Sequence, residues 1–162
     1  MQTGKPRIGF VGLGLMGHGM AKNLLAKGFP LTVRVHRNRK AAEDVLAAGA
    51  KEAKTHADLA NASDVVILCV TGSPQVEEIV YAENGILSAA RAGLIVVDTS
   101  TAEPESTAKV RGDLGGRGTA YVDAPLARTP RRPKRAGSTP WSAPTMRPSP
   151  GSGRSSPRTA RT

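Results

Sequence analysis

A glycine-rich stretch near the start of the chain has the spacing of a phosphate-binding loop. GLGLMG follows the apolar run RIGFV directly and precedes a stretch of good helix formers. In a G-x-G-x-x-G motif the first glycine allows a tight turn, the second lets the backbone approach a pyrophosphate, and the third permits close helix–sheet packing. Because the start of a helix also offers unpaired N–H groups to phosphates, the motif predicts a dinucleotide site, with a ligand-free tight turn as the alternative. The candidate residues are Gly12, Leu13, Gly14, Leu15, Met16 and Gly17.

The residues that follow the second expected strand indicate which dinucleotide would fit. An Asp or Glu at this point would bind the 2′-hydroxyl of the adenosine ribose of NAD. Here the stretch reads RVHRNRK, and no acid follows before Glu43. A carboxylate would repel a 2′-phosphate, whereas guanidinium groups bind phosphate through bidentate, charge-assisted hydrogen bonds. The sequence therefore favours NADP as the cofactor, with NAD possible, and a solvated basic helix start is the alternative. The candidate contacts are Arg34, His36 and Arg37.

The pattern of apolar residues predicts the elements that would hold these groups in place. Asp64–Val70 and Leu94–Asp98 are apolar on both faces, which is typical of central strands in a parallel sheet covered by helices on both sides. The strands and helices alternate along the chain, so we expect an α/β fold, a Rossmann-type doubly wound parallel sheet. The expected strands are Arg7–Val11, Leu31–Val35, Asp64–Val70, Leu94–Asp98 and Thr119–Asp123. The expected helices are Leu15–Lys27, Arg39–Ala48, Thr55–Ala60, one that starts at Ser73, and Glu103–Leu114.

The positive charge of the chain lies almost entirely in its last segment. Up to Ala127 there are 14 Lys/Arg and 13 Asp/Glu, and from Arg128 onward there are nine Lys/Arg, seven Pro and no acid. The net charge of +10 therefore describes the tail and not the expected folded part. Apolar periodicity also stops there, so we expect a domain over residues 1–127 and a disordered, basic Pro/Ser-rich tail over 128–162. Because Trp141 is its one aromatic residue, we expect nonspecific attraction to nucleic acid and no specific binding.

Cysteine use and apolar run length bear on where the protein resides. Cys69 lies inside an apolar run and cannot form an internal disulfide, so we expect a buried, inert thiol. The longest uninterrupted apolar stretch, Val65–Val70, is too short to span a bilayer. The glycines of the first apolar segment and the lack of a cleavage site argue against a signal peptide. We therefore expect a cytoplasmic protein that has no membrane partner.

A longer stretch around the glycine motif resembles a family signature. FVGLGLMGHGMAKNL resembles that of the β-hydroxyacid dehydrogenases, the group of 3-hydroxyisobutyrate dehydrogenases and tartronate semialdehyde reductases. 6-Phosphogluconate dehydrogenase and the imine reductases are more distant relatives. Met16, Met20 and Asn23 agree with the signature as well as the three glycines do. VVILCVTGSPQVEEIVY, ENGIL, VVDTSTAEP and YVDAP then follow in the family's order, so the resemblance covers Arg7 to Thr129.

The resemblance implies hydride transfer between NADP and a small 3-hydroxy acid, or its aldehyde or imine counterpart. Val70 and Thr71 would run beside the cofactor, although the family commonly has Leu-Pro there, and Gln75 would begin the next helix. Ser100 and Thr101, which stand in the family's D-x-S-T motif, would lie near the nicotinamide. Capping of the following helix is the alternative role for these two hydroxyls.

The same resemblance implies that the chain lacks the catalytic lysine. In the family that lysine follows D-x-P-V-S-G-G, begins an all-helical second domain, and shuttles the proton between solvent and the substrate hydroxyl. Here Asp123–Pro125 matches D-x-P, but Leu126–Thr129 replaces V-S-G-G, and Lys134 lies among prolines. We therefore expect a truncated chain with no catalytic residue, no metal, no helical second domain and no family oligomer interface. Whether it is active as an enzyme stays open.

The composition of the tail suggests how such a truncation could arise. If a GC-rich family gene is translated one nucleotide out of register from about Arg132, permitted codons restore A-x-x-G-x-L and V-G-A, which resemble the family's continuation. A frameshift and a genuine extension are the two explanations of the tail. Three functions remain: the NADP(H)-binding domain of a 3-hydroxyacid dehydrogenase-type oxidoreductase, inactive in this form; a stand-alone dinucleotide-binding module; and a nonspecific nucleic-acid binder.

Overall fold

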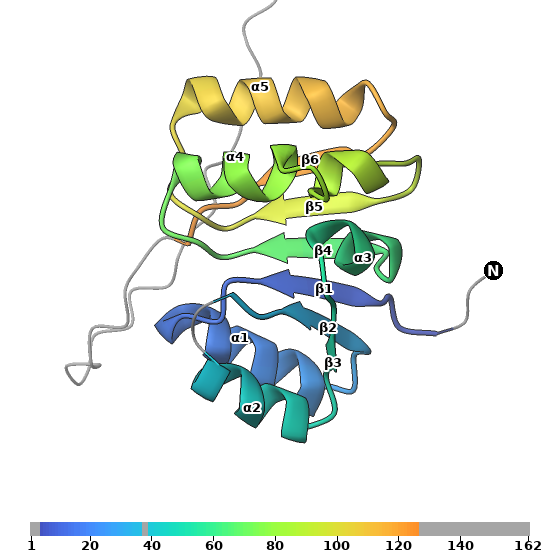
Figure 1. Cartoon of the computed structure of the whole chain (residues 1–162), viewed down its shortest axis with the longest axis vertical. Coiled ribbons are helices and arrows are strands. Elements are labelled where there is room, and N and C mark those ends of the chain that lie inside the picture. Colours follow the sequence, from blue (N-terminus) through green and yellow to red (C-terminus); the bar gives the residue numbers. More distant parts are fainter. Residues whose placement is uncertain (1–3, 37–38, 127–162) are drawn as a thin grey trace, which may run out of the picture. The chain divides into compact units, whose positions relative to one another are not determined.

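The computed structural model describes residues 4–36 and 39–126. They all belong to the first of two compact units of the chain, Met1–Thr129; the predicted tail over 128–162 lies outside the described residues. Six parallel strands form one sheet in the order β3-β2-β1-β4-β5-β6 (Figure 1). This arrangement confirms the Rossmann-type doubly wound fold. The strands are β1 (Ile8–Val11), β2 (Leu31–Arg34), β3 (Lys51–Glu52), β4 (Val65–Leu68), β5 (Ile95–Asp98) and β6 (Ala120–Asp123). The helices are α1 (Leu15–Ala26), α2 (Arg39–Ala47), α3 (His56–Asn61), α4 (Ser73–Tyr81), the 3-10 helix η1 (Ile86–Ala89) and α5 (Pro104–Gly115).

The strand order reverses beside β1, which lies between β2 and β4. Val11 at the end of β1 is in register with Arg34 of β2 and with Leu68 of β4, so the three strands end at the same level. The chain leaves β1 toward one face of the sheet and leaves β4 toward the other. In open α/β sheets such a switch point, at the carboxyl ends of the strands, opens a crevice in which ligands bind.

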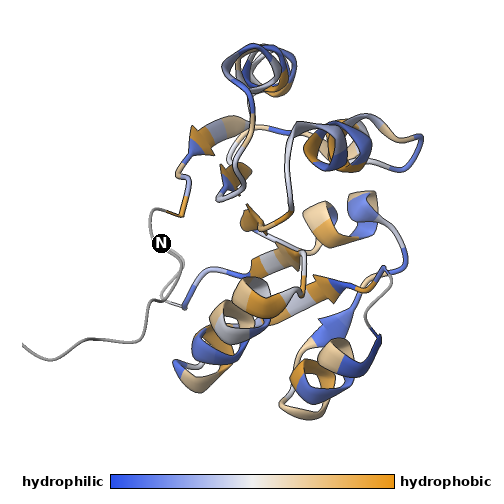
Figure 2. Ribbon diagram, turned by 90° about the vertical axis from the view of Figure 1, so that its left-hand side faces the viewer, coloured by the Kyte–Doolittle hydropathy of each residue, from blue (hydrophilic) through white to orange (hydrophobic). Residues whose placement is uncertain are grey.

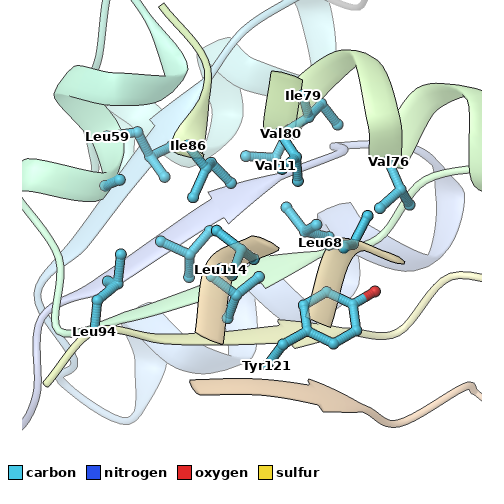
Figure 3. Close-up of a cluster of buried hydrophobic side chains, with 14 of the residues drawn as sticks. Val11, Leu59, Leu68, Val76, Ile79, Val80, Ile86, Leu94, Leu114 and Tyr121 are labelled. Atoms are coloured by element: carbon cyan, nitrogen blue, oxygen red, sulfur yellow. The ribbon is translucent and has the colours of Figure 1, made fainter. Parts of the chain in front are cut away.

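Helices cover the two faces of the sheet and bury two apolar clusters. One cluster lies between the sheet and α3, α4 and α5, and Figure 3 shows its aliphatic side chains converging from these elements. The other lies between the sheet and α1 and α2, and includes Phe10, Ala21, Val33 and Val45. The strands are accordingly coloured mainly as hydrophobic in Figure 2, whereas the helices carry hydrophilic residues as well. Each fully buried aliphatic side chain contributes about 1.5–3 kcal/mol to folding.

The two faces differ in how completely they are covered. On the face that carries α1 and α2, Ile95 of β5 and Val122 of β6 are 38% and 45% exposed. On the opposite face, Val96 is fully buried and Tyr121 is 8% exposed, because α4 and α5 pack there. An apolar strip of β5 and β6 therefore faces solvent in the described part of the chain.

The structure contains one strand and one 3-10 helix that the apolar pattern did not predict. β3 is two residues long and exposed, and it pairs with β2 through Lys51 opposite Thr32. Arg39 of α2 holds it by an ion pair with Glu52, with 3.1 Å between Nη1 and Oε1. Such a short polar strand shows no alternation of apolar and polar residues. Strand pairing and an ion pair hold it in place, and burial contributes nothing. The helix η1, Ile86–Ala89, was likewise missed, although Ile86 belongs to the core.

Candidate dinucleotide-binding site

A cleft of about 470 Å³ lies at the switch point, beside the carboxyl ends of β1, β2 and β4. The glycine loop forms one wall, the segment after β4 and the first turns of α4 form another, and the residues after β2 close one side. Eight of the predicted residues line it: Gly12, Leu13, Gly14, Arg34, His36, Val70, Thr71 and Gln75. Leu15, Met16, Gly17, Ser100 and Thr101 do not line the cleft, and Arg37 lies outside the described residues.

Two glycines of the loop are required by the fold itself. Gly12 has φ +103°, and a Cβ on it would lie 2.1 Å from the carbonyl oxygen of Cys69. A Cβ on Gly17 would lie 1.8 Å from the carbonyl oxygen of Gly12 and 3.0 Å from Phe10. The first glycine therefore makes the tight turn against β4, and the third lets α1 pack closely on β1, as the motif predicts.

Gly14 is different, because no feature of the described chain requires a glycine there. Its φ is −73°, which any residue adopts, and no atom of the described residues lies within 4 Å of a Cβ built on it. Gly14 is the N-cap of α1, and no described side chain caps the helix. A bare backbone at an uncapped helix start that borders a cleft is what a closely approaching pyrophosphate needs. The loop therefore fits a dinucleotide.

The end of β2 places one cation at the edge of the cleft. Arg34 donates from Nη1 to the carbonyl oxygen of its neighbour Val35, and its buried Nε has no hydrogen-bond partner among the described residues. His36 also lines the cleft and is exposed. A guanidinium at the edge of the cleft suits an anionic group of a ligand, because it can form charge-assisted hydrogen bonds with it.

Sequence reasoning missed several residues that also line the cleft. His56 opens α3, where a capping box between Thr55 and Asp58 fixes the helix start. Burial lowers the pKa of His56 below its usual range. The charges of Arg34 and His36 lower this pKa further, whereas the carboxylate of Glu78 raises it. The neutral imidazole is therefore favoured. For Glu78 and Ile79 a signal existed, because they lie one turn after Gln75 and share its helix face.

The cysteine at this site is less buried than its sequence context suggests. Cys69 follows the last residue of β4 and is only partly buried, so the prediction of a buried thiol is wrong. One side of it packs against the cluster beneath α1 and α2, and the other borders the cleft. The apolar run continues past the end of the strand, so hydrophobicity alone could not mark where the sheet opens.

Ser100 and Thr101 follow β5 and do not cap the next helix. The N-cap of α5 is Glu103, whose N–H donates to Oγ of Ser73 at 2.7 Å, and no side-chain oxygen of the described residues caps the helix. Ser100 instead accepts a hydrogen bond from the N–H of Val70 at 3.0 Å. The alternative role of these two hydroxyls as helix caps is therefore wrong. Ser100 binds the backbone of Val70, which is part of the cleft wall, without lining the cleft itself.

A second, larger and more open hollow of about 680 Å³ lies on the surface of α1 and α2. It is lined by His18, Lys40, Ala41, Glu43, Asp44 and Ala47. Lys22 and His18 lie 3.2 and 3.3 Å from a carboxylate oxygen of Asp44. The hydrogen bond and charge of Lys22 lower the pKa of Asp44. The hollow touches neither a strand end nor the glycine loop, so we assign the site to the smaller cleft.

Neither metal ligands nor a membrane segment adds to this site. Within residues 4–36 and 39–126, no group of His, Cys, Asp and Glu could hold a metal ion. Across the same part of the chain, no helix is long and apolar enough to cross a membrane.

Comparison with known proteins agrees with the fold. The model of the NAD binding domain of 6-phosphogluconate dehydrogenase matches residues 7–138. The chain therefore belongs to this family of pyridine-dinucleotide-binding domains.

Named relatives make the resemblance to hydroxyacid dehydrogenases concrete. 2-Hydroxy-3-oxopropionate reductase of Escherichia coli is 36% identical over 121 residues, which are 75% of this chain and 41% of the relative. The structure of Psf3 in complex with NADP+ and 2-OPP has a TM-score of 0.69 at 34% identity, over 75% of this chain and 43% of that one. The structure of Mycobacterium tuberculosis 3-hydroxyisobutyrate dehydrogenase with L-serine has a TM-score of 0.68 at 26% identity, over 77% and 42%. This chain thus spans about two fifths of the length of these relatives.

Proposed function

We propose that this chain is the NADP(H)-binding domain of a 3-hydroxyacid dehydrogenase-type oxidoreductase. The observation that carries the proposal is the bare backbone at Gly14, where neither a contact of the described chain nor a backbone angle requires a glycine. Family membership and the cleft at the switch point support it. The cofactor, when bound, supplies or accepts a hydride. The residues of this chain bind and orient it.

The finer part of the proposal is a preference for NADP over NAD. It rests on the end of β2, where Arg34 and His36 stand and where no carboxylate is available for a ribose 2′-hydroxyl. Arg34 lines the cleft, and a guanidinium can donate to two phosphate oxygens at once. Glu78 is an acid that lines the cleft, but it stands on α4 and not at the strand end.

Paired titrations test both parts of this proposal. The full chain is titrated with NADPH and with NADH while the fluorescence of the reduced nicotinamide is followed. We expect saturable binding of both, tighter for NADPH by about tenfold, which corresponds to about 1.4 kcal/mol. Binding should also raise the melting temperature, because a ligand that binds only the folded state stabilises it. If neither nucleotide saturates, the proposed function is wrong; if NADH binds as tightly as NADPH, the preference for NADP is wrong.

A second candidate is a dinucleotide-binding module that does not catalyse a reaction. Leu126–Thr129 replaces the family's V-S-G-G, and the chain spans 41% of the length of the Escherichia coli relative. A turnover assay with NADP+ and 3-hydroxyisobutyrate, and with NADPH and glyoxylate-type aldehydes, separates the two candidates. We expect binding without turnover for this chain by itself. Measurable turnover would show that the chain contains a proton-transfer group that the family motif does not predict.

A further inference from the structure

We propose that Tyr121 is a positioning residue for the cofactor cleft, although it stands on the edge strand β6 and does not line the cleft. Three hydrogen bonds connect its hydroxyl to the cleft wall at Val70. This inference rests on the proposed function for its consequence in binding. Its structural part concerns this chain alone and can be tested without a cofactor.

The first link joins β6 to β5 beneath α4 and α5. The ring of Tyr121 lies at the edge of the buried cluster (Figure 3), and its hydroxyl donates to Oδ2 of Asp98 at 2.6 Å. Asp98 is the last residue of β5 and is 0% exposed. Burial raises the pKa of Tyr121 far above its usual range, and the hydrogen bond with Asp98 raises it further. The hydroxyl therefore stays protonated and keeps donating.

The second and third links pass from β5 to the loop after β4. The other oxygen of Asp98, Oδ1, accepts the N–H of Ser100 at 2.8 Å. The hydroxyl of Ser100 accepts the N–H of Val70 at 3.0 Å. Val70 and Thr71 line the cleft opposite the glycine loop. A fully buried carboxylate thus uses one oxygen to hold the edge strand and the other to orient the loop.

The chemistry of Asp98 explains why loss of one of these three hydrogen bonds should weaken the other two. A buried carboxylate needs donors for both oxygens, and among the described residues Tyr121 is the only side chain that donates to Asp98. Removing the tyrosine hydroxyl leaves Oδ2 without that partner, so Asp98 is expected to turn or admit water. The N–H of Ser100 is then no longer well aligned with its acceptor, Oδ1 of Asp98. Ser100 shifts as a result, and the hydrogen bond from the N–H of Val70 to its hydroxyl weakens as well.

The molecule contains a matched control for this contact. Tyr81, the last residue of α4, also donates its hydroxyl to an aspartate, Oδ2 of Asp113, at 2.7 Å. That pair lies on the surface between α4 and α5 and is bordered by Lys109. Neither residue lines the cleft. Tyr81→Phe therefore removes the same chemical contact at a place where the cleft should not respond.

Amide hydrogen exchange tests the structural part of the proposal. In Tyr121→Phe, exchange at Val70 N–H should accelerate by about tenfold, the loss expected for one hydrogen bond of about 1.4 kcal/mol. Cys69 N–H, which donates to the carbonyl oxygen of Val11 at 2.9 Å, should keep its rate. Ser100→Ala should release Val70 directly, and its effect should not add to that of Tyr121→Phe. Tyr81→Phe should change neither amide. Unchanged exchange at Val70 in Tyr121→Phe would overturn the proposal; if that variant does not fold, unchanged exchange in Ser100→Ala would do so.

NADPH titration of the same variants tests the consequence in binding. We expect the Kd to rise by about tenfold in Tyr121→Phe and in Ser100→Ala, less than multiplicatively in the double variant, and not at all in Tyr81→Phe. Wild-type chain that fails to bind NADPH would refute the proposed function, while hydrogen exchange would still decide on the positioning role. Wild-type chain that binds, together with a Tyr121→Phe variant that binds equally well, would refute the positioning role alone.

Discussion

The amino end of the parallel sheet and the switch point at the carboxyl ends of β1 and β2 differ in how their polar groups are paired. At the amino ends of the strands the chain satisfies its own groups: Arg7 binds the carboxylate of Asp64 through two nitrogens, at 2.7 and 3.2 Å. Arg91 donates to the carbonyl oxygens of Ala60 and Ser63, at 3.1 and 2.7 Å. At the switch point, by contrast, no side chain of the described residues caps the start of α1, and Nε of Arg34 has no hydrogen-bond partner among the described residues.

This difference distinguishes polar groups that stabilise the fold from polar groups that are available to bind a ligand. Buried or converging polar groups are normally paired, so a paired end needs no further explanation. A switch point with a bare glycine backbone and an uncapped helix start leaves backbone donors that a bound anion can use. The comparison predicts that substitutions at the carboxyl end change binding and that substitutions at the amino end change stability.

The largest effect is expected for Gly14→Ala. The added methyl group would occupy the space into which a pyrophosphate fits, so the Kd for NADPH should rise about 100-fold, a change of about 2.7 kcal/mol. Folding should lose no more than about 1 kcal/mol, the cost of a poorer N-cap, because the new Cβ meets no described atom within 4 Å. Fluorescence titration and thermal melting measure the two quantities.

Gly19→Ala is the matched control for this substitution. Gly19 lies in the same helix and also has no described atom within 4 Å of a built Cβ. We expect unchanged NADPH binding and a gain in stability of up to about 1 kcal/mol from helix propensity. If Gly14→Ala binds NADPH as the wild type does, the assigned site is wrong.

A smaller effect, on cofactor choice, is expected for Arg34→Gln. Loss of the guanidinium should weaken NADPH binding by about tenfold and leave NADH binding nearly unchanged, because only NADPH has the 2′-phosphate. Arg39→Gln is the control, since Arg39 is engaged by Glu52 at 3.1 and 3.3 Å. Titrations with both nucleotides give the ratio of dissociation constants. If Arg39→Gln changes that ratio more than Arg34→Gln does, the assignment of the NADP preference to Arg34 is wrong.

The smallest effect is expected at the amino end, in Asp64→Asn. The variant should lose about 1 kcal/mol of stability at pH 7, since the pair with Arg7 is partly exposed, and bind NADPH unchanged. The hydrogen bonds of Arg7 lower the pKa of Asp64 to about 2, below its ordinary 3.8. A carboxyl whose pKa is lowered by folding stabilises the fold above its unfolded pKa and ceases to do so as the pH falls through the folded value.

Urea unfolding at a series of pH values measures this contribution. The difference in stability between wild type and Asp64→Asn should be constant above about pH 4 and should shrink as the pH falls toward 2. A difference that stays constant down to pH 2 would show that the ion pair with Arg7 does not stabilise the fold. A weakened NADPH affinity in this variant would contradict the functional separation of the two ends.

The part of this architecture that local chemistry dictates could be predicted from the sequence. Five strands and the roles of Gly12 and Gly17 followed from apolar runs and from the motif's spacing, and the structure confirms them. β3 could not be predicted, because its two exposed residues form a strand only by pairing with β2. The contact between Tyr121 and Asp98 could not be predicted either. It joins side chains of two neighbouring strands, and sequence patterns do not give the register of their pairing.

Chemical-shift mapping of the amide N–H groups during NADPH titration tests the central claim most directly. The claim is that the carboxyl end of the sheet binds the dinucleotide and that the amino end does not take part. We expect the shifts to concentrate at Gly12–Gly17, Arg34–His36 and Val70–Gln75, and the amides of Asp64, Arg91 and Thr119 to stay in place. Shifts that are absent, or that concentrate at the amino end of the sheet, would contradict the account.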